Sequence, residues 1–438
     1  MSSIIEYNSL LSIGLILQEY IQDLLIPLAR DVVSSTDFDS QNKKNQEILS
    51  DSDSNSDSDS YQGRLKARNF QFSYSTEKWI EAIKEHTFKT KILPINLQTI
   101  EALINAHKDL KKTGEISEEQ KKTLEILKNQ LSKEIKEIGG EAFIKLETRS
   151  PKDSVYEQPN SKAENFLFEK LLQVHQKKKL KINWKNKIFA NDILKYFIHS
   201  TSQVLKVKNG QEALDLLINS SRIFTDLLRG SEFKNQDGSP YSSSIIIRKW
   251  EKIKSCYEFR GFVHNNKLNC ISQYFDIVFY PVLLAQKSQI EKIIRDFHSS
   301  IIDPKLKHIY KDYVIDFALL KSKNQNGKIT LNPICIEINP FHTLAGPCLF
   351  SWKDDRDVIM GQKPFEFRIR EECLNDPLDN IMGFWNRKIK NEIFPAIISQ
   401  DRQKWFRRIF LLIILFLVLF WTFYIRYKLL QNPQIRRK

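Results

Sequence analysis

The longest regular pattern of apolar and polar positions lies between Ser117 and Ile138 and predicts an amphipathic helix. Its apolar positions recur every three or four residues and share one helical face: Leu124, Leu127, Leu131, Ile135 and Ile138. Ser117 and Gln120 have the spacing of a capping box, and Gly139 and Gly140 follow the last apolar position. The pattern therefore predicts both ends of this helix and the face that packs on the body.

Shorter apolar runs predict β-strands between and beyond such helices. They lie at 141–146 (EAFIKL), Ile245–Ile247, Phe259–Val263, Leu268–Ser272, Tyr313–Leu320 and Pro333–Ile338. The segment Gln289–Ile301 has a helical pattern, and 148–154 (TRSPKDS) has the proline and polar residues of a loop. Strands and helices alternate along the same stretch of chain, which favours an α+β or α/β body.

The first 66 residues differ from the body that follows them. Residues 1–33 carry a wide and imperfect apolar arc, which predicts an amphipathic helix that docks on the body or folds locally; membrane contact is less favoured because the polar side lacks Lys and Arg. Residues 34–66 are predicted to be a disordered acidic linker, because 51–60 reads DSDSNSDSDS and has no apolar residue to bury. The folded body is expected at 67–400.

Near the C-terminus, Ile409–Ile425 is a run of 17 residues without a charge. As a helix it would be about 26 Å long, close to the hydrocarbon thickness of about 30 Å. Basic residues flank the run, and Trp421 and Tyr424 suit an interfacial belt, so we expect a transmembrane anchor at 405–428. A buried core helix is the alternative, but the run has no polar face. Because 13 residues follow Ile425, we expect insertion after synthesis, with the body on the cytosolic face of an intracellular membrane.

Composition narrows the classes of function. The 438 residues are 41% hydrophobic and 27% charged, which excludes a chain that is disordered throughout. The net charge is +14, but residues 401–438 hold nine basic residues and one acid, so the remaining chain has an excess of only six positive charges. Direct binding to nucleic acid is therefore not expected. The five cysteines form no CxxC pair, which suits a reducing compartment.

Two strand patterns carry the residues that suggest chemistry. Asp316 lies in DYVIDFALL, while Glu337 and Asn339 lie two apart in ICIEINPF and project to the same side of a strand. Two carboxylates and an amide oxygen are the ligands that Mg²⁺ favours when phosphates complete its coordination. Arg248, Lys249 and Lys145 are candidates to neutralise those phosphates, and Trp250 is a candidate wall for an adenine pocket. A carboxylate and an amide on a solvated strand face are the alternative interpretation.

These residues stand in motifs that resemble the cell division cycle protein 123 family. The motifs follow one another in family order: FQFSYSTEKW and FKTKILPI at 70–95, GGEAFIKLETRSPKDS at 139–154, LLINSSRIFTDL at 216–227, IIIRKWEKIKSCYEFRGFVHNNKLNCISQ at 245–273, and DYVIDFALL with ICIEINPFHTLAGPCLFSW at 312–352. The resemblance covers roughly residues 69–395. It implies an α+β, ATP-grasp-like body, with two α+β lobes around a nucleotide cleft, and a role as an assembly chaperone of the eukaryotic translation initiation factor 2 complex.

The resemblance also implies which residues bind ATP and Mg²⁺. Lys145 would contact phosphate, with Thr148, Ser150, Lys152 and Asp153 along the adjoining nucleotide loop. Arg248, Lys249 and Trp250 would form the hinge segment around adenine, with Glu258 and Arg260 lining the same cleft. Asp316, Glu337 and Asn339 would hold Mg²⁺, in agreement with the strand pattern.

Three positions depart from the family pattern. Glu337 stands where the family usually has Asp, Tyr274 where it usually has Arg, and His342 where it usually has Gly. The longer Glu337 side chain changes the distance to a metal ion, and Tyr274 removes a cation that could face phosphate. These departures predict a weaker affinity for ATP than in relatives.

Three functions remain open on the sequence. The favoured one is a membrane-tethered chaperone that binds ATP and Mg²⁺ and grips the γ subunit of initiation factor 2. The second is an ATP-grasp ligase that modifies a protein or peptide through an acyl phosphate. The third is an anchored scaffold with a degenerate cleft.

Overall fold

The structure, a computed structural model, describes residues 61–156, 161–178, 183–233, 238–323, 329–343, 345–381 and 383–431. The predicted helix at 1–33 and residues 34–60 of the predicted linker lie outside these residues. Helix α2 (Tyr61–Phe72) begins inside the range predicted as linker, so the folded body starts earlier than residue 67. Gln71 on α2 donates a hydrogen bond to Asp226 (3.0 Å), which ties this helix to the body.

Four strands form the first sheet, in the order β1 (Thr90–Ile95), β4 (Ser243–Lys249), β2 (Ala142–Leu146) and β3 (Lys206–Val207). Every neighbouring pair is antiparallel. β4 lies between β1 and β2, which explains its continuous apolar run, because Ile245–Ile247 are fully buried. The predicted strands at EAFIKL and at Ile245–Ile247 are confirmed as β2 and β4.

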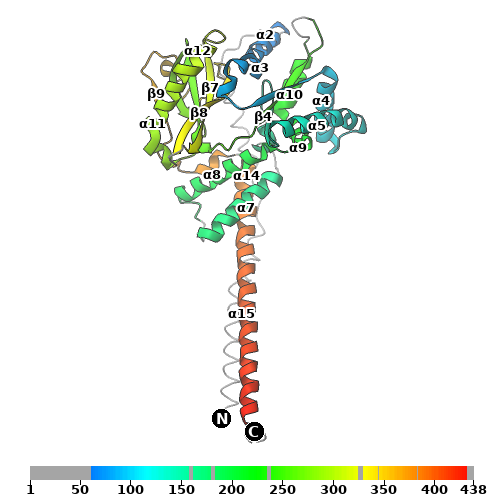
Figure 1. The fold of residues 1–438 in the computed structure, drawn as a ribbon, viewed down its shortest axis with the longest axis vertical. Coiled ribbons are helices and arrows are strands. Elements are labelled where there is room, and N and C mark those ends of the chain that lie inside the picture. Colours follow the sequence, from blue (N-terminus) through cyan, green and yellow to red (C-terminus); the bar gives the residue numbers. More distant parts are fainter. Residues whose placement is uncertain are drawn as a thin grey trace, which may run out of the picture. The chain divides into compact units, whose positions relative to one another are not determined.

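Helices gather beside this first sheet (Figure 1). They are α4 (Leu97–Thr113), α5 (Glu118–Ile138), α9 (Gly210–Asn219) and α10 (Ser221–Ser231), with α6 (Asp153–Tyr156) against α10. The short α3 (Thr76–Trp79) and η3 (Glu81–His86) instead contact a strand of the second sheet. The predicted amphipathic helix is confirmed as α5, and its five apolar positions are all buried. The predicted capping box is wrong, because the Ser117 side chain makes no cap hydrogen bond. The predicted end at Gly139 is confirmed, since its φ of 127° is one that glycine tolerates.

Five strands form the second sheet, in the order β8 (Ile329–Asn339), β7 (Tyr313–Lys323), β5 (Glu258–His264), β6 (Lys267–Gln273) and β9 (Glu366–Arg368). All pairs are antiparallel except β6 with β9. A two-residue turn joins β5 to β6 through Asn265 and Asn266, whose φ values of 52° and 61° suit a tight hairpin. The strands predicted at these positions are confirmed, and the mainly antiparallel sheets make the body α+β.

A continuous helical segment packs beside the second sheet. It comprises α11 (Pro281–Phe297), the π-helix η5 (His298–Ile302) and α12 (Asp303–Leu306). α11 contacts β8, and its residues Leu283, Ile290 and Ile294 are fully buried. The short elements η4 (Ser255–Tyr257) and α13 (Arg356–Ile359) lie before β5 and before β9 in the chain.

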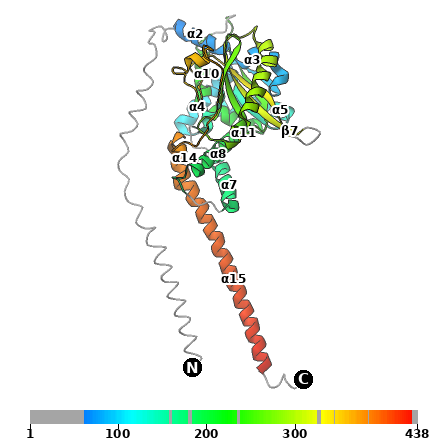
Figure 2. The same cartoon turned by 90° about the vertical axis from the view of Figure 1, so that its left-hand side faces the viewer.

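The strands β7 and β8 form a ribbon that is longer than the strands beside it (Figure 2). β7 pairs with β8 from Val314 to Lys323, but its pairing with β5 ends at Ala318, opposite Glu258. Residues 319–323 of β7 therefore have a strand partner on one side only. The pairing of β7 with β8 shifts between Asp316 and Phe317, the position of a β-bulge.

The remaining helices form a separate layer below the sheets in Figure 1. They are α7 (Ser161–Lys178), α8 (Lys187–Val204), η6 (Pro377–Asn380), α14 (Gly383–Lys388), the π-helix η7 (Ile389–Ile393) and α15 (Phe394–Gln431). α7 and α8 pack on each other. The first turn of α15 is held in the core, because Phe394 and Ile397 are buried.

Beyond its first turns, α15 presents apolar side chains that no other described residues cover. Among the described residues, one helical segment, Gly383–Ile425, is long and apolar enough to cross a membrane. The exposed large apolar side chains from Trp405 to Ile425 have exposed fractions between 41% (Ile414) and 71% (Phe423). Exposed apolar surface of this extent marks contact with a membrane or with another protein. The transmembrane anchor therefore stays a prediction.

Candidate functional site

The register of the second sheet places the predicted metal ligands side by side. Asp316 on β7 lies opposite Glu337 on β8, and Val314 lies opposite Asn339. On the other side of β7, Asp316 lies opposite Arg260 of β5. Since directly paired residues on neighbouring strands point to the same face, these side chains form one polar row across three strands.

Asp316 is the centre of this row. Its carboxylate accepts two hydrogen bonds from Arg260, from Nε to Oδ1 (2.8 Å) and from Nη2 to Oδ2 (2.8 Å). Asn339 donates a third from Nδ2 to Oδ2 (3.3 Å). The remaining guanidinium nitrogen of Arg260, Nη1, donates to the carbonyl of Gly346 (2.7 Å). A planar, two-pronged pairing of this kind fixes both side chains in position.

Glu337 forms the bridge between the two sheets. Its Oε1 accepts a hydrogen bond from the ammonium group of Lys145 on β2, and the lysine side chain is 4% exposed. Arg248 on β4 also crosses to the second sheet, because it donates to the carbonyl of Ile336 and to the hydroxyl of Thr87. The first sheet thus delivers two cations to the strand that carries Glu337 and Asn339.

Tyr274 lies between two further cations. Its hydroxyl accepts a hydrogen bond from Lys152 (3.1 Å). The ring faces the ammonium of Lys152 at 5.2 Å and the guanidinium of Arg260 at 5.1 Å. An aromatic ring attracts cations without adding charge, so Tyr274 separates Lys152 from Arg260 at the position where the resemblance expects an arginine.

The electrostatics of the row follow from burial and from these pairs. Burial, together with the nearby charge of Asp316, raises the pKa of Glu258 to about 7. Burial alone would also raise the pKa of Glu337, but the ammonium groups of Lys145 and Lys152 outweigh it and hold that pKa below its ordinary value. Burial lowers the pKa of Arg248 to about 10. For Arg260, burial acts in the same direction, but the Asp316 carboxylate outweighs it and raises the pKa.

Not every predicted site residue joins this group. Asp153 instead holds the start of α10, since its carboxylate accepts from the hydroxyl of Ser220 (2.6 Å) and the backbone of Arg222 (3.0 Å). Thr148 donates to Asp226 (2.9 Å). In this structure Asp153 and Thr148 thus make hydrogen bonds within the first lobe of the body, and their contact with a nucleotide stays a prediction.

The predicted hinge residues Lys249 and Trp250 differ in their surroundings. Lys249 is exposed and forms an ion pair with Glu251 (2.9 Å), and Trp250 is partly buried against the core. Ser150 lies in the loop between β2 and α6. The sequence did not point to Asp226 as a hydrogen-bond acceptor, although it also accepts a hydrogen bond from Arg149 (3.1 Å). A single acidic residue in an amphipathic helix does not indicate which side chains it will bind.

The predicted metal ligands Asp316, Glu337 and Asn339 suit a divalent cation only when the two carboxylates are released from their ion pairs. Among the residues that the structure describes, no group of three or more His, Cys, Asp and Glu side chains is arranged to hold a metal ion. Asp316, Glu337 and Asn339 supply two carboxylates and an amide, which suit Mg²⁺ when phosphate oxygens provide further ligands. Both carboxylates are already paired, however, with Arg260 and with Lys145. They become free for a metal only when these cations find other anionic partners, such as phosphates.

Comparison with known proteins supports the resemblance. The model of the D123 family matches residues 169–382. A translation initiation factor eIF2 assembly protein of Candida albicans is 26% identical over 231 residues, which are 52% of this chain and 52% of that protein. The protein of the same name from Vanderwaltozyma polyspora is 30% identical over 202 residues, which are 44% of this chain and 50% of that protein. On these matches the chain is similar to the D123 family over residues 169–382.

A viral relative and a solved structure cover more of the chain. A CDC123-like protein of Acanthamoeba polyphaga mimivirus is 28% identical over 303 residues, which are 67% of this chain and 71% of that protein. The solved structure of C-terminally truncated Cdc123 from Schizosaccharomyces pombe has a TM-score of 0.46 and 21% identity, with 69% of this chain and 98% of that chain covered. The chain spans about half the length of the first curated relatives it matches.

Proposed function

We propose that this chain binds ATP together with Mg²⁺ through the polar row of β5, β7 and β8 and the cations of the first sheet. One observation carries the proposal: Lys145, Lys152 and Arg260 converge on the same place as Asp316, Glu337 and Asn339. Clustered cations beside clustered oxygen ligands are what a metal-bound triphosphate requires, because phosphates need positive charge and the metal needs oxygen.

In this proposal the ion pairs exchange partners when the nucleotide binds. Lys145 and Arg260 would turn from carboxylates to phosphate oxygens, and Glu337 and Asp316 would then be free to hold Mg²⁺ with Asn339. Bound to these three residues, the metal would supply positive charge that offsets the charge of the phosphates. Glu258, Arg248, Lys249 and Trp250 would line the remainder of the nucleotide site, as the resemblance implies.

We further propose that the chain assists assembly of the initiation factor 2 complex through its γ subunit, while α15 tethers it to an intracellular membrane with the body in the cytosol. The names of the relatives support the assembly role, since several are called eIF2 assembly proteins. The exposed apolar surface of α15 supports the tether. Binding of ATP to the native state alone would stabilise a form that grips its client, without hydrolysis.

The first prediction concerns the metal ligand that bears no charge. Asn339→Ala is expected to weaken binding of Mg²⁺-ATP by about tenfold or more, because one oxygen ligand is lost. The substitution removes only a 3.3 Å hydrogen bond to Asp316, so the body should stay folded. Isothermal titration calorimetry with ATP and MgCl₂ measures the change.

The matched control is Asn332→Ala, on the same strand but beyond the row. It should leave the affinity unchanged. Titration of MgCl₂ without nucleotide should give no heat of binding to the full chain, because Asp316 and Glu337 are held by Arg260 and Lys145. Equal ATP affinity of Asn339→Ala and the unchanged chain would remove Asn339 from the site.

The second prediction tests the assembly role. The chain lacking residues 405–438 is expected to capture the γ subunit of initiation factor 2 in a pull-down, and saturating Mg²⁺-ATP should increase the captured amount. Asn339→Ala should abolish the increase while leaving basal capture. Formation of ADP that depends on an added amine acceptor would instead identify a ligase, and no capture with or without ATP would contradict the assembly role.

A further inference from the structure

The part of β7 that extends past β5 has an open edge. Residues 319–323 pair with β8, while β5 ends at Glu258, opposite Ala318. Within the described residues, the backbone of 319–323 makes no backbone hydrogen bond to any segment except β8. A strand edge of this kind presents N–H and C=O groups that an added strand can satisfy.

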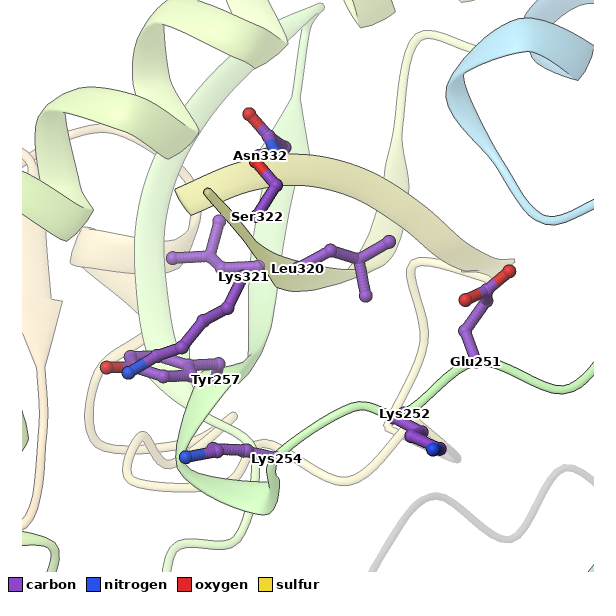
Figure 3. Close-up of a pocket in the computed structure, with 9 residues that line it drawn as sticks. Glu251, Lys252, Lys254, Tyr257, Leu320, Lys321, Ser322 and Asn332 are labelled. Carbon is purple, nitrogen blue, oxygen red and sulfur yellow. Dashed lines mark hydrogen bonds between the residues drawn. The ribbon is translucent and has the colours of Figure 1, made fainter. Parts of the chain in front are cut away.

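This edge forms one wall of a cavity of about 330 Å³, which we name the edge groove. Its lining residues are Glu251, Lys252, Lys254, Tyr257, Leu319, Leu320, Lys321, Ser322 and Asn332. Figure 3 shows the two walls: the strand residues Leu320, Lys321 and Ser322 on one side, and Lys252 and Lys254 on the facing coil.

The edge groove is positively charged. Lys252, Lys254 and Lys321 are exposed, and among the residues that the structure describes none of the three forms an ion pair. The acid at the rim, Glu251, is neutralised by Lys249 (2.9 Å). Lys321 lies over the ring of Tyr257 at 4.8 Å, so its ammonium is held beside the groove. The charges therefore favour an acidic ligand.

The groove also has the mixed lining of a strand-binding site. The half-buried Leu320 supplies apolar surface, while Asn332 of β8 donates to Ser322 of β7 (2.7 Å) on the strand wall. Five residues of strand measure about 17 Å, the length of a five-residue peptide in extended form. A compact anion such as phosphate would satisfy one or two lysines but would leave the backbone edge unused.

We propose that the edge groove is a docking site for an extended acidic segment of a partner protein, which adds as a strand to residues 319–323 of β7. Backbone hydrogen bonds would give affinity, and Lys252, Lys254 and Lys321 would select for acidic side chains. The proposal does not depend on ATP binding, because none of the three lysines belongs to the row around Asp316.

The test uses the full chain in detergent micelles and a fluorescein-labelled peptide of seven alternating Glu and Val residues, with binding followed by fluorescence anisotropy. The triple substitution Lys252→Ala, Lys254→Ala and Lys321→Ala should weaken binding by about tenfold or more. The matched control replaces three exposed lysines elsewhere, Lys267, Lys305 and Lys311, by alanine. It changes the net charge equally and should leave the affinity within twofold.

Two further measurements distinguish strand addition from charge attraction alone and from binding at the nucleotide site. The same peptide with N-methylated peptide bonds should lose binding, and unchanged affinity of that peptide would overturn the proposal in favour of charge attraction alone. Mg²⁺-ATP at saturation should not displace the peptide, and competition would assign the edge groove to the nucleotide site and overturn the proposal. Asn339→Ala should bind the peptide normally, so failure of the ATP proposal is distinguishable from failure of this one.

Discussion

Asp316→Ala is expected to lower the free energy of unfolding by about 3–5 kcal/mol, the usual cost of removing one partner of a buried ion pair. The side chains of Asp316 and Arg260 are 4% and 11% exposed, so little solvent is available to replace the lost carboxylate. The guanidinium would keep the Gly346 carbonyl and the ring of Tyr274, neither of which neutralises its charge. Urea unfolding of the full chain in detergent, followed by near-ultraviolet circular dichroism, measures the change.

The control removes both charges. Arg260→Met combined with Asp316→Ala should recover much of the lost stability, because no unpaired buried charge remains. If Asp316→Ala alone unfolds like the unchanged chain, the pair is screened by solvent and the buried pairing is wrong. The expected instability also shows why Asn339→Ala is the better test of ATP binding: loss of binding in Asp316→Ala would combine the loss of a proposed ligand with a disturbed Arg260.

The strand pattern was enough to predict that oxygen-bearing side chains gather on one face of the second sheet. Glu337 and Asn339 lie two apart on one strand, and alternation alone places them on one face. Their proximity to Asp316 depended on pairing of the two strands that follow each other in sequence, and neighbouring strands usually pair. The register shift at Asp316 was not predictable, because a β-bulge leaves no clear mark in a single sequence.

The pairing of particular cations with particular carboxylates could not be predicted from the sequence. Lys145 and Glu337 are 192 residues apart and come from different sheets. Only the packing of the two sheets decides that this lysine, among the many in the chain, reaches that carboxylate. The same holds for Tyr274, whose place between Lys152 and Arg260 requires three separate segments to meet. The resemblance alone could not supply the hydrogen-bond partners of Asp153, which are Ser220 and Arg222.

Elements with strong periodicity were the most predictable part of the fold. The helix α5 agrees with its prediction to within one residue at its start, because five buried apolar positions fix its face. Its capping box failed because a side-chain hydrogen bond depends on local geometry that spacing does not determine. The backbone N–H of Ser117 is instead bound by Asp109 (3.2 Å), from the preceding helix α4.

Loss of the apolar stretch of α15 is expected to have the largest effect on where the protein resides. We expect the full chain to stay in the membrane pellet after carbonate extraction, and a chain lacking residues 405–438 to move to the supernatant. Leu415→Arg with Leu419→Arg should have the same effect, since a charge at the centre of a spanning helix costs about 2.5–3.5 kcal/mol. Both side chains are about half exposed, at 55% and 49%, so the arginines would not disturb the body.

The matched control is Leu415→Ala with Leu419→Ala, which shortens the same side chains without adding charge and should remain in the pellet. Carbonate-resistant association of the chain lacking 405–438 would place the attachment elsewhere. Recovery of the full chain in the supernatant as an oligomer would show that α15 packs on a second protein surface. In a spanning helix the exposed apolar side chains meet lipid, and the cost of the arginines comes from desolvating their charge. In an oligomer in water the same arginines could stay hydrated at the rim, so a spanning helix and an oligomer predict different sensitivity to the substitution.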